Sequence, residues 1–232
     1  MDHIEIETRV LGGLRLDFPA ERHIGALAMA WDDGKNHQVA FVGPQDLRAA
    51  LARGEYGSML ASADLVLTSS PSLARQAAET GSAGQVRRIP VPRHREAYAA
   101  LFEGSGEDEE ASGGLVSAYR PLHVLSLILS ALETRSGTLF LVGGSVSCLQ
   151  AAEGNLKSTF PGIRIVGRSR GDYPSQGEEG VMKAIQKASP DLVLVGSLVE
   201  GGELWIPRHM RFTKSGIFLY EGSIIEVLAG RA

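Results

Sequence analysis

Glycines and small hydroxyl side chains follow three short apolar runs of the sequence, a pattern typical of loops that hold a phosphate. The three segments are Ser69-Ser70, Gly143-Gly144-Ser145 and Gly196-Ser197. Glycine lets a backbone approach its ligand closely, and amides at the start of a following helix can bind an anion. Neither Gly-x-Gly-x-x-Gly nor the P-loop pattern occurs, and glycines that serve only as turns would give the same pattern.

Aromatic and charged residues farther along the chain could contact the same ligand. Tyr173 could stack on a nucleobase, with Arg168 and Arg170 beside it to bind phosphate, although exposed loops often have this composition. Glu203 and Trp205 follow a further pair of glycines and could line the site. The six histidines are scattered, with no pair at ligand spacing, so we expect no metal site.

Two charged segments interrupt the middle of the chain. The arginines of Gln85–Arg95 could hold a lipid diphosphate or anionic headgroups. We favour a solvated loop that pairs weakly with the acidic residues 107–110, because exposed ion pairs contribute little. Glu103–Gly114 is acidic, rich in Gly and Ser, and almost without apolar residues, so we expect a flexible loop there.

The overall composition is that of an ordinary globular protein. Of its 232 residues, 44% are hydrophobic and 22% charged, which suits one α/β domain over residues 1–232. The net charge of −4 does not favour nucleic acid as a partner, and the single cysteine, Cys148, rules out a disulfide framework. The N-terminus does not resemble a secretory signal, and no apolar stretch approaches the roughly 20 residues that span a bilayer. We therefore expect a cytoplasmic protein.

Helical and strand patterns alternate over most of the chain. Short, wholly apolar runs such as Leu192–Val195 are typical of strands covered on both faces, and their alternation with helices predicts a parallel sheet. Two strands around Gly12-Gly13 predict an N-terminal hairpin. We therefore expect an α/β fold, namely a doubly wound, Rossmann-like, mostly parallel sheet preceded by a β-hairpin.

The boundaries of these elements follow from apolar periodicity and from glycine and proline signals. The predicted helices span residues 19–31, 44–61 with a break near Gly54 and Gly57, 72–79, 121–134, 148–159, 178–188, 204–210 and 224–228. The later strands span 37–42, 65–67, 139–142, 163–166, 192–195 and 216–220. In such sheets ligands bind outside the carboxyl ends of the strands, where the three glycine and hydroxyl segments would lie.

Several segments, in the same order, resemble the WecG/TagA/CpsF family of glycosyltransferases. Leu139–Gly144 matches the family's strand that ends in two glycines, Phe160–Gly167 matches its Pro-Gly signature, and Ser189–Gly196 matches its Pro-Asp strand. Glu203-x-Trp205-Ile206 matches the end of its Pro-Lys-Gln-Glu-x-Trp motif, and Leu228-Ala229-Gly230 matches its closing Leu-Ala-Gly. Ala63–Leu67 matches the strand before its active-site loop.

The resemblance implies an enzyme that moves an N-acetylhexosamine-type sugar from a nucleotide diphosphate sugar, such as a UDP-sugar, to a lipid-linked or polysaccharide acceptor. It implies no cofactor and no metal, and a location in the cytoplasm or at the inner face of the membrane. The residues that it places at the nucleotide sugar are Gly143, Gly144, Ser145, Tyr173, Gly196, Ser197, Glu203 and Trp205.

The chain departs from the family at the residues that do chemistry. The family's catalytic aspartate and the following glycine correspond to Ser69 and Ser70, and a serine without a neighbouring His or Lys is a poor base. The catalytic residue is therefore unassigned, and an inactive descendant that binds or regulates is the alternative to an active transferase. The missing glycine pattern disfavours an oxidoreductase. Self-association is a further expectation, since the apolar helix 224–228 would be partly uncovered.

Overall fold

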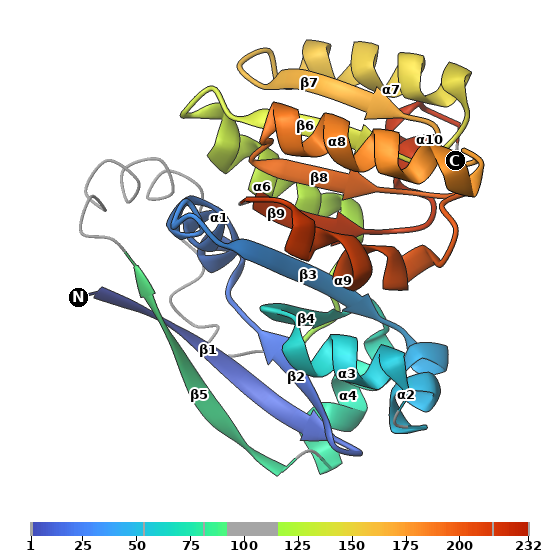
Figure 1. Cartoon of the computed structure of the whole chain (residues 1–232). Coiled ribbons are helices and arrows are strands. Elements are labelled where there is room, and N and C mark those ends of the chain that lie inside the picture. Colours follow the sequence, from blue (N-terminus) through green and yellow to red (C-terminus); the bar gives the residue numbers. More distant parts are fainter. Residues whose placement is uncertain (1, 53, 81, 92–115, 215, 232) are drawn as a thin grey trace.

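A computed structural model describes residues 2–52, 54–80, 82–91, 116–214 and 216–231. The predicted acidic loop 103–114, and the part of the basic cluster beyond residue 91, lie outside these residues. The model confirms the expected α/β architecture: a parallel sheet of six strands, flanked by helices, lies beside a smaller antiparallel sheet (Figure 1).

The parallel sheet combines strands from both halves of the chain. Its strand order is β4-β3-β9-β8-β6-β7, and every neighbouring pair is parallel. The strands are β3 (Asn36–Val42), β4 (Leu65–Thr68), β6 (Thr138–Val142), β7 (Arg164–Ser169), β8 (Leu192–Val195) and β9 (Gly216–Tyr220). Because β3 pairs with β9, the first half of the chain lies directly beside the last strand.

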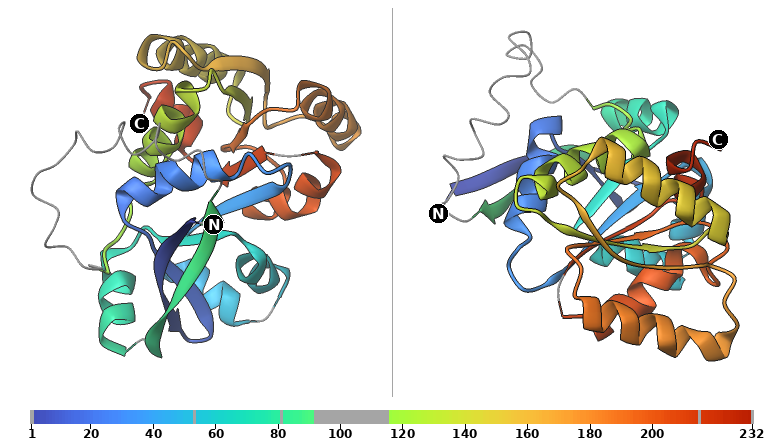
Figure 2. Two further views of the ribbon diagram at one scale, coloured as in Figure 1. Left: turned by 90° about the vertical axis from the view of Figure 1, so that its left-hand side faces the viewer. Right: turned by 90° about the horizontal axis from the view of Figure 1, so that it is seen from above.

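Helices cover both faces of this sheet (Figures 1 and 2). One face carries α8 (Glu178–Ala188) and α9 (Trp205–His209), and the other carries α1 (Glu21–Ala30), α6 (Pro121–Glu133), α7 (Val146–Thr159) and α10 (Ile224–Leu228). The remaining helices are α2 (Pro44–Leu51), α3 (Glu55–Ser62) and α4 (Pro71–Thr80), so the helix predicted over 44–61 is broken where its glycines indicated.

Alternation along the central strands divides the core into two layers. Leu139 and Leu141 of β6 pack into the larger hydrophobic cluster with α1, α6 and α7. Phe140 and Val142 point to the other face and pack with α8 and Trp205. Side chains alternate between the faces of a strand, so a wholly apolar strand is stable only with a covering layer on each side.

The smaller sheet differs from the predicted hairpin. Its order is β2-β1-β5, because β1 (Asp2–Leu11) pairs antiparallel with both β2 (Leu14–Phe18) and β5 (Ser82–Val91). The third strand was missed because its arginines and Pro90 indicated a loop. At the edge of a sheet, however, charged side chains and proline are well tolerated. Arg88 there forms an ion pair with Glu5, its partner across the strands.

Asp17 joins the two sheets. This carboxylate of β2 is fully buried and accepts a hydrogen bond of 2.8 Å from the amide of Val66 in β4. Arg15 lies 3.2 Å from it and Arg87 of β5 lies 3.4 Å from it. The carboxylate therefore satisfies an amide at the edge of the parallel sheet and draws two arginines of the smaller sheet toward that edge.

His37 couples the stability of the fold to pH. Its ring nitrogens lie 2.9 Å from Asp33 and 3.2 Å from Asp64, and the ring stacks on Trp31 at 4.9 Å. Burial acts to lower the pKa of His37, but the hydrogen bonds and charges of Asp64 and Asp33 outweigh it and raise that pKa above 6.5.

Since the folded state holds this proton more tightly than the unfolded state, protonated His37 stabilises the fold. The contribution is complete below pH 6.5 and is lost as the pH rises through the folded pKa. We expect His37→Gln to flatten the dependence of unfolding free energy on pH above 6.5 in urea titrations. An identical pH dependence in the variant and the wild-type protein would contradict this assignment.

Candidate active site

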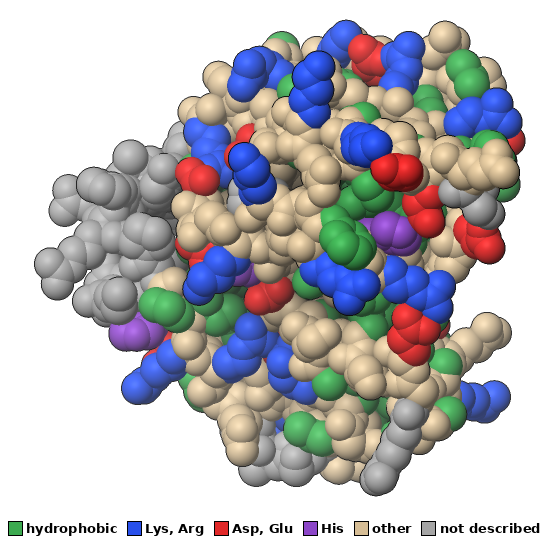
Figure 3. All heavy atoms as spheres, in the orientation of Figure 1, with side chains coloured by type: hydrophobic (Ala, Val, Ile, Leu, Met, Phe, Trp, Pro, Cys, Tyr) green, Lys and Arg blue, Asp and Glu red, His purple; other side chains and the backbone are tan. Residues whose placement is uncertain are grey.

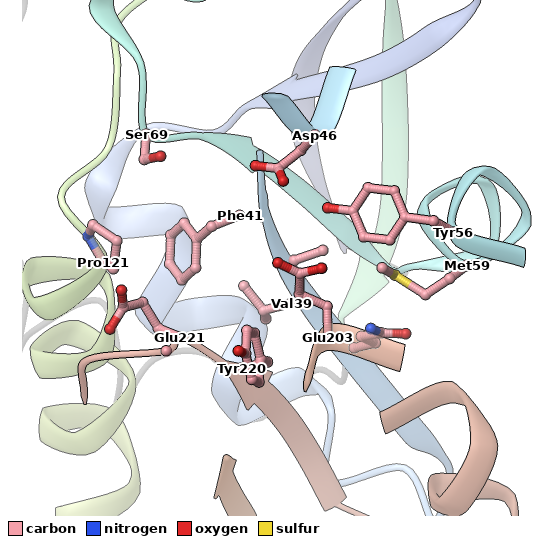
Figure 4. A pocket seen from close by; sticks show the side chains of 13 residues that line it. Val39, Phe41, Asp46, Tyr56, Met59, Ser69, Pro121, Glu203, Tyr220 and Glu221 are labelled. Atoms are coloured by element: carbon pink, nitrogen blue, oxygen red, sulfur yellow. The ribbon is translucent and has the colours of Figure 1, made fainter. Parts of the chain in front are cut away.

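A pocket opens at the carboxyl ends of β3, β4 and β9 (Figure 4). After β3 the chain enters α2, whereas after β9 it enters α10 on the opposite face of the sheet. Such a divergence leaves a crevice, which is where open α/β sheets usually bind ligands. The lining residues are Gln38, Val39, Ala40, Phe41, Asp46, Tyr56, Met59, Ser69, Pro121, Glu203, Tyr220, Glu221 and Gly222.

The pocket is small, with a cavity volume of about 160 Å³. Sites that enclose a drug-sized molecule have roughly 300–1,000 Å³. The cavity therefore suits one sugar ring better than a whole nucleotide sugar. Its polar lining includes three carboxyl groups, those of Asp46, Glu203 and Glu221.

Glu203 is held in the pocket by its neighbours in the chain. Gly201 and Gly202 have positive φ angles of 86° and 52°, a backbone conformation that glycine adopts without strain. They lead into a short 3-10 helix, η2 (Gly202–Leu204), which continues directly into α9. Trp205 is fully buried two residues later and anchors this segment. A glycine turn thus places Glu203, and the buried Trp205 side chain holds the segment there.

Asp46 and Tyr56 reach the pocket from α2 and α3. Asp46 accepts a hydrogen bond of 2.6 Å from the amide of Gly43 and so caps the start of α2. The Tyr56 hydroxyl points toward Asp46 and Glu203 (Figure 4), yet it forms no hydrogen bond of good geometry. A bidentate ion pair at 2.7 and 2.6 Å joins Arg208 of α9 to Glu55 of α3. It ties the Tyr56 helix to the segment that carries Glu203.

The electrostatics of the pocket favour protonation of Glu203. Burial raises the pKa of this carboxyl group, and the negative charge of Asp46 raises it further. Burial also raises the pKa values of Tyr56 and Tyr220, with added contributions from Asp46 and Glu203 for Tyr56 and from Glu203 and Glu221 for Tyr220. Both tyrosines are therefore neutral at physiological pH and can donate hydrogen bonds.

Two of the sequence-predicted residues lie at this pocket, namely Ser69 and Glu203. Ser69 is exposed at the end of β4, and its hydroxyl forms no hydrogen bond within the described residues. Ser70 is buried instead. Its hydroxyl lies 2.8 Å from that of Ser72 and accepts a hydrogen bond of 3.4 Å from the amide of Leu73, which caps α4.

The predicted glycine loops lie at the same edge of the sheet but under α10. The amides of Gly143, Gly144 and Gly196 donate to the carbonyl groups of Ser169, Ser197 and Val142, so they are not available to a phosphate. A methyl group on Gly196 would lie 2.5 Å from Ile225. These glycines thus permit close packing between the strand ends and α10.

The two serines beside those glycines also have partners. Ser145 caps α7 by accepting a hydrogen bond from the amide of Cys148 at 3.3 Å. Ser197 donates to the carboxylate of Glu226 in α10 at 2.6 Å. Binding of a nucleotide sugar by this group remains a prediction.

Tyr173, Trp205 and His209 form a cluster beside α8. Trp205 donates a hydrogen bond of 2.7 Å to the Tyr173 hydroxyl, and its ring stacks on His209 at 4.6 Å. His209 in turn lies 3.1 Å from Glu178. Trp205 is fully buried and Tyr173 is half-buried, so of the two only Tyr173 has surface to offer a ligand.

Several pocket residues were missed from the sequence, above all Gln38, Asp46, Tyr56, Tyr220 and Glu221. Asp46, Tyr220 and Glu221 lie at or just beyond the ends of β3 and β9, so the rule that drew attention to Ser69 could have found them. Tyr56 carries no such signal, because it lies inside α3. It reaches the pocket only because α3 packs beside η2.

In the described part of the chain, no group of three or more His, Cys, Asp or Glu residues is arranged to hold a metal ion. None of its helices is both long enough and apolar enough to cross a membrane. Charged side chains of both signs are interspersed over the face in Figure 3, where the described residues form no single basic surface.

Comparison with known proteins identifies the family. The model of the glycosyl transferase WecG/TagA/CpsF family matches residues 117–232, which is half of the chain. The chain therefore belongs to this family of glycosyltransferases. No curated protein matches the chain. The matched half supplies Pro121, Glu203, Tyr220 and Glu221 to the pocket, and the preceding half completes it.

Proposed function

We propose that the protein transfers an N-acetylhexosamine-type sugar from a nucleotide diphosphate sugar, such as a UDP-sugar, to a hydroxyl group of a lipid-linked or polysaccharide acceptor. The observation that carries this proposal is the pocket between β3 and β9. It lies at the crevice expected of the fold, is sized for one sugar ring, and is lined by groups that hydrogen-bond hydroxyls.

In this proposal the sugar of the donor occupies the pocket and the nucleotide lies along the carboxyl edge of the sheet toward Tyr173. The half-buried Tyr173 ring would stack on the base. Among the described residues no Lys or Arg lines the pocket itself, which fits a sugar better than a diphosphate. We further propose a cytoplasmic location, with contact to the membrane surface where the acceptor is a lipid. We also propose that the protein self-associates and that residues 1–232 form a single domain.

A second candidate is an inactive family member that binds a nucleotide sugar or a glycan as a regulatory module. The observation in its favour is Ser69, which by resemblance takes the place of the family's catalytic aspartate and whose hydroxyl forms no hydrogen bond within the described residues. The glycine amides already used for packing around α10 favour it too.

Calorimetric titration with UDP and UDP-N-acetylglucosamine, followed by an assay for donor consumption with a lipid-linked acceptor, separates the candidates. We expect binding and turnover for a transferase. Binding without turnover would favour the regulatory module. The absence of any heat of binding at millimolar ligand would contradict the transferase and would leave only a module that binds a glycan.

The variant Glu203→Ala tests where the sugar lies. Loss of a hydrogen bond to a charged group should weaken UDP-N-acetylglucosamine binding by about tenfold while leaving UDP binding unchanged. Glu200→Ala is the matched control, because Glu200 is exposed on the same loop and does not line the pocket. Equal affinities of the two variants for the sugar nucleotide would place the sugar elsewhere.

A further inference from the structure

The three carboxyl groups of the pocket differ in how they are engaged. Asp46 accepts the Gly43 amide at 2.6 Å as the cap of α2. Glu221 accepts hydrogen bonds from the amide and the hydroxyl of Ser223, at 2.9 Å and 3.0 Å, at the start of α10. Glu203 accepts no hydrogen bond and forms no ion pair within the described residues. It is therefore the one pocket carboxylate whose lone pairs are all available to a ligand.

Two neighbouring polar groups are also unpartnered, which indicates that a ligand belongs here. Gln38 lines the pocket with only 2% of its surface exposed, and its Oε1 atom has no hydrogen-bond partner. The buried Tyr56 hydroxyl points toward Asp46 without a hydrogen bond of good geometry to it. A buried polar atom without a partner costs about 1–3 kcal/mol, so a ligand with hydroxyl groups would relieve both.

We propose that Glu203 is the general base of the transfer reaction, in place of the aspartate that this chain lacks at Ser69. This inference rests on the proposed function and specifies its chemistry. Gln38 accepts a hydrogen bond from a sugar hydroxyl and Tyr56 donates one to the ligand. Asp46 is a positioning residue that acts on Glu203 through its charge.

The step is a single displacement. The acceptor hydroxyl oxygen attacks the anomeric carbon of the donor sugar and forms the new glycosidic bond, while its proton passes to the Glu203 carboxylate. The bond from the anomeric carbon to the diphosphate oxygen breaks, and its electron pair leaves with the nucleoside diphosphate. A base whose pKa is raised toward the working pH is more effective in this role than an ordinary carboxylate.

Asp46 supplies part of that increase. Its charge disfavours ionisation of Glu203, in addition to the burial of Glu203 itself. The other titratable groups that face Glu203 are Tyr56 of α3, Tyr220 at the end of β9, and Glu221. Both tyrosines have raised pKa values and stay neutral over the relevant range. The acidic limb of the plot of kcat against pH should therefore reflect the ionisation of Glu203, and it should shift when the charge of Asp46 is removed.

The experiment measures kcat against pH and donor affinity for the full chain and for Glu203→Gln, Glu221→Gln, Asp46→Asn and the exposed control Glu200→Gln. Glutamine keeps the shape and hydrogen-bonding capacity of glutamate but cannot take up the proton. We expect Glu203→Gln to lower kcat by about 100- to 10,000-fold, with little change in donor affinity and with loss of the acidic limb. Glu200→Gln should match the wild-type protein.

Asp46→Asn tests whether Asp46 acts through its charge, because a purely structural role would not shift the pH dependence of kcat. It keeps an oxygen for the Gly43 amide but removes the charge beside Glu203. The acidic limb should therefore shift to lower pH, and kcat near neutral pH should fall modestly, because a less basic Glu203 is a weaker general base. An unshifted limb would overturn the role of Asp46, and thermal unfolding of each variant shows that it is folded.

The remaining outcomes are equally distinct. Turnover that survives in Glu203→Gln with its acidic limb intact overturns the base assignment and leaves the proposed function standing. If Glu221→Gln loses turnover while Glu203→Gln stays active, the assignment of Glu203 as the base is wrong and Glu221 takes that role. If the wild-type protein neither binds nor consumes any sugar nucleotide, the proposed function and the base assignment fall together.

Discussion

Replacing Asp17 with alanine should lower the free energy of unfolding by about 2–4 kcal/mol. The substitution leaves the amide of Val66 without its partner inside the protein. It also removes the carboxylate that Arg15 and Arg87 share. Both arginines are partly exposed and retain carbonyl partners at Ala63 and Asp64, so the lost amide bond accounts for most of the effect.

Asp17→Asn separates the hydrogen bond from the charge. Burial raises the pKa of Asp17 despite the opposing effects of Arg15, the Val66 amide and Arg87, so the charged form is disfavoured in the folded state. The asparagine oxygen can still accept from Val66, and the variant should lose less stability than Asp17→Ala in urea denaturation. Asp172→Ala, which removes a solvent-exposed partner of Arg170, should leave the stability unchanged. Equal losses in the two Asp17 variants would show that the charge dominates.

Trp205→Ala should destabilise the protein by about 3–5 kcal/mol, the range for truncation of a buried aromatic side chain. Trp205 is among the largest fully buried side chains and packs with Phe140, Val142 and Phe218 on one face of the sheet. Thermal or urea unfolding measures the loss. Phe212→Ala is the matched control, because that nearby ring is half exposed and its loss should have a much smaller effect.

The milder variant Trp205→Phe links this core position to the pocket. It keeps an aromatic ring in place but removes the hydrogen bond to Tyr173, which should cost about 1 kcal/mol. Since Trp205 anchors the segment that carries Glu203, turnover should fall by more than this loss of stability explains at temperatures where the variant is fully folded. Unchanged turnover would show that η2 holds Glu203 without the help of Trp205.

Much of the fold follows from local patterns. The wholly apolar strands β6 and β8, the helices between them and the break between α2 and α3 were all predicted, because periodicity, glycine and proline act over a few residues. Strand β5 was not, since its arginines and Pro90 indicate a loop. Only pairing with β1, about 80 residues earlier, makes that segment a strand.

The candidate site was predicted less completely. The carboxyl edge of the parallel sheet was expected to bind the ligand, and Ser69 and Glu203 do lie at the pocket there. The glycine pairs drew the prediction toward β6 and β8. In the folded protein, however, Gly144 and Gly196 are the positions where Ile225 of α10 packs against the strand ends. Local sequence does not distinguish a glycine that lets a phosphate approach the backbone from a glycine that lets a helix pack against it.

Patterns within short segments of the sequence predicted the family and the class of fold, and they led us to expect a ligand at the carboxyl edge of the sheet. Which side chains meet at that edge depends on contacts between distant segments of the folded chain. The pairing of β3 with β9 brings Asp46 and Tyr56 to Glu203, although they are distant from it in the chain. Strand order depends on which surfaces can be buried together, and no local pattern specifies it.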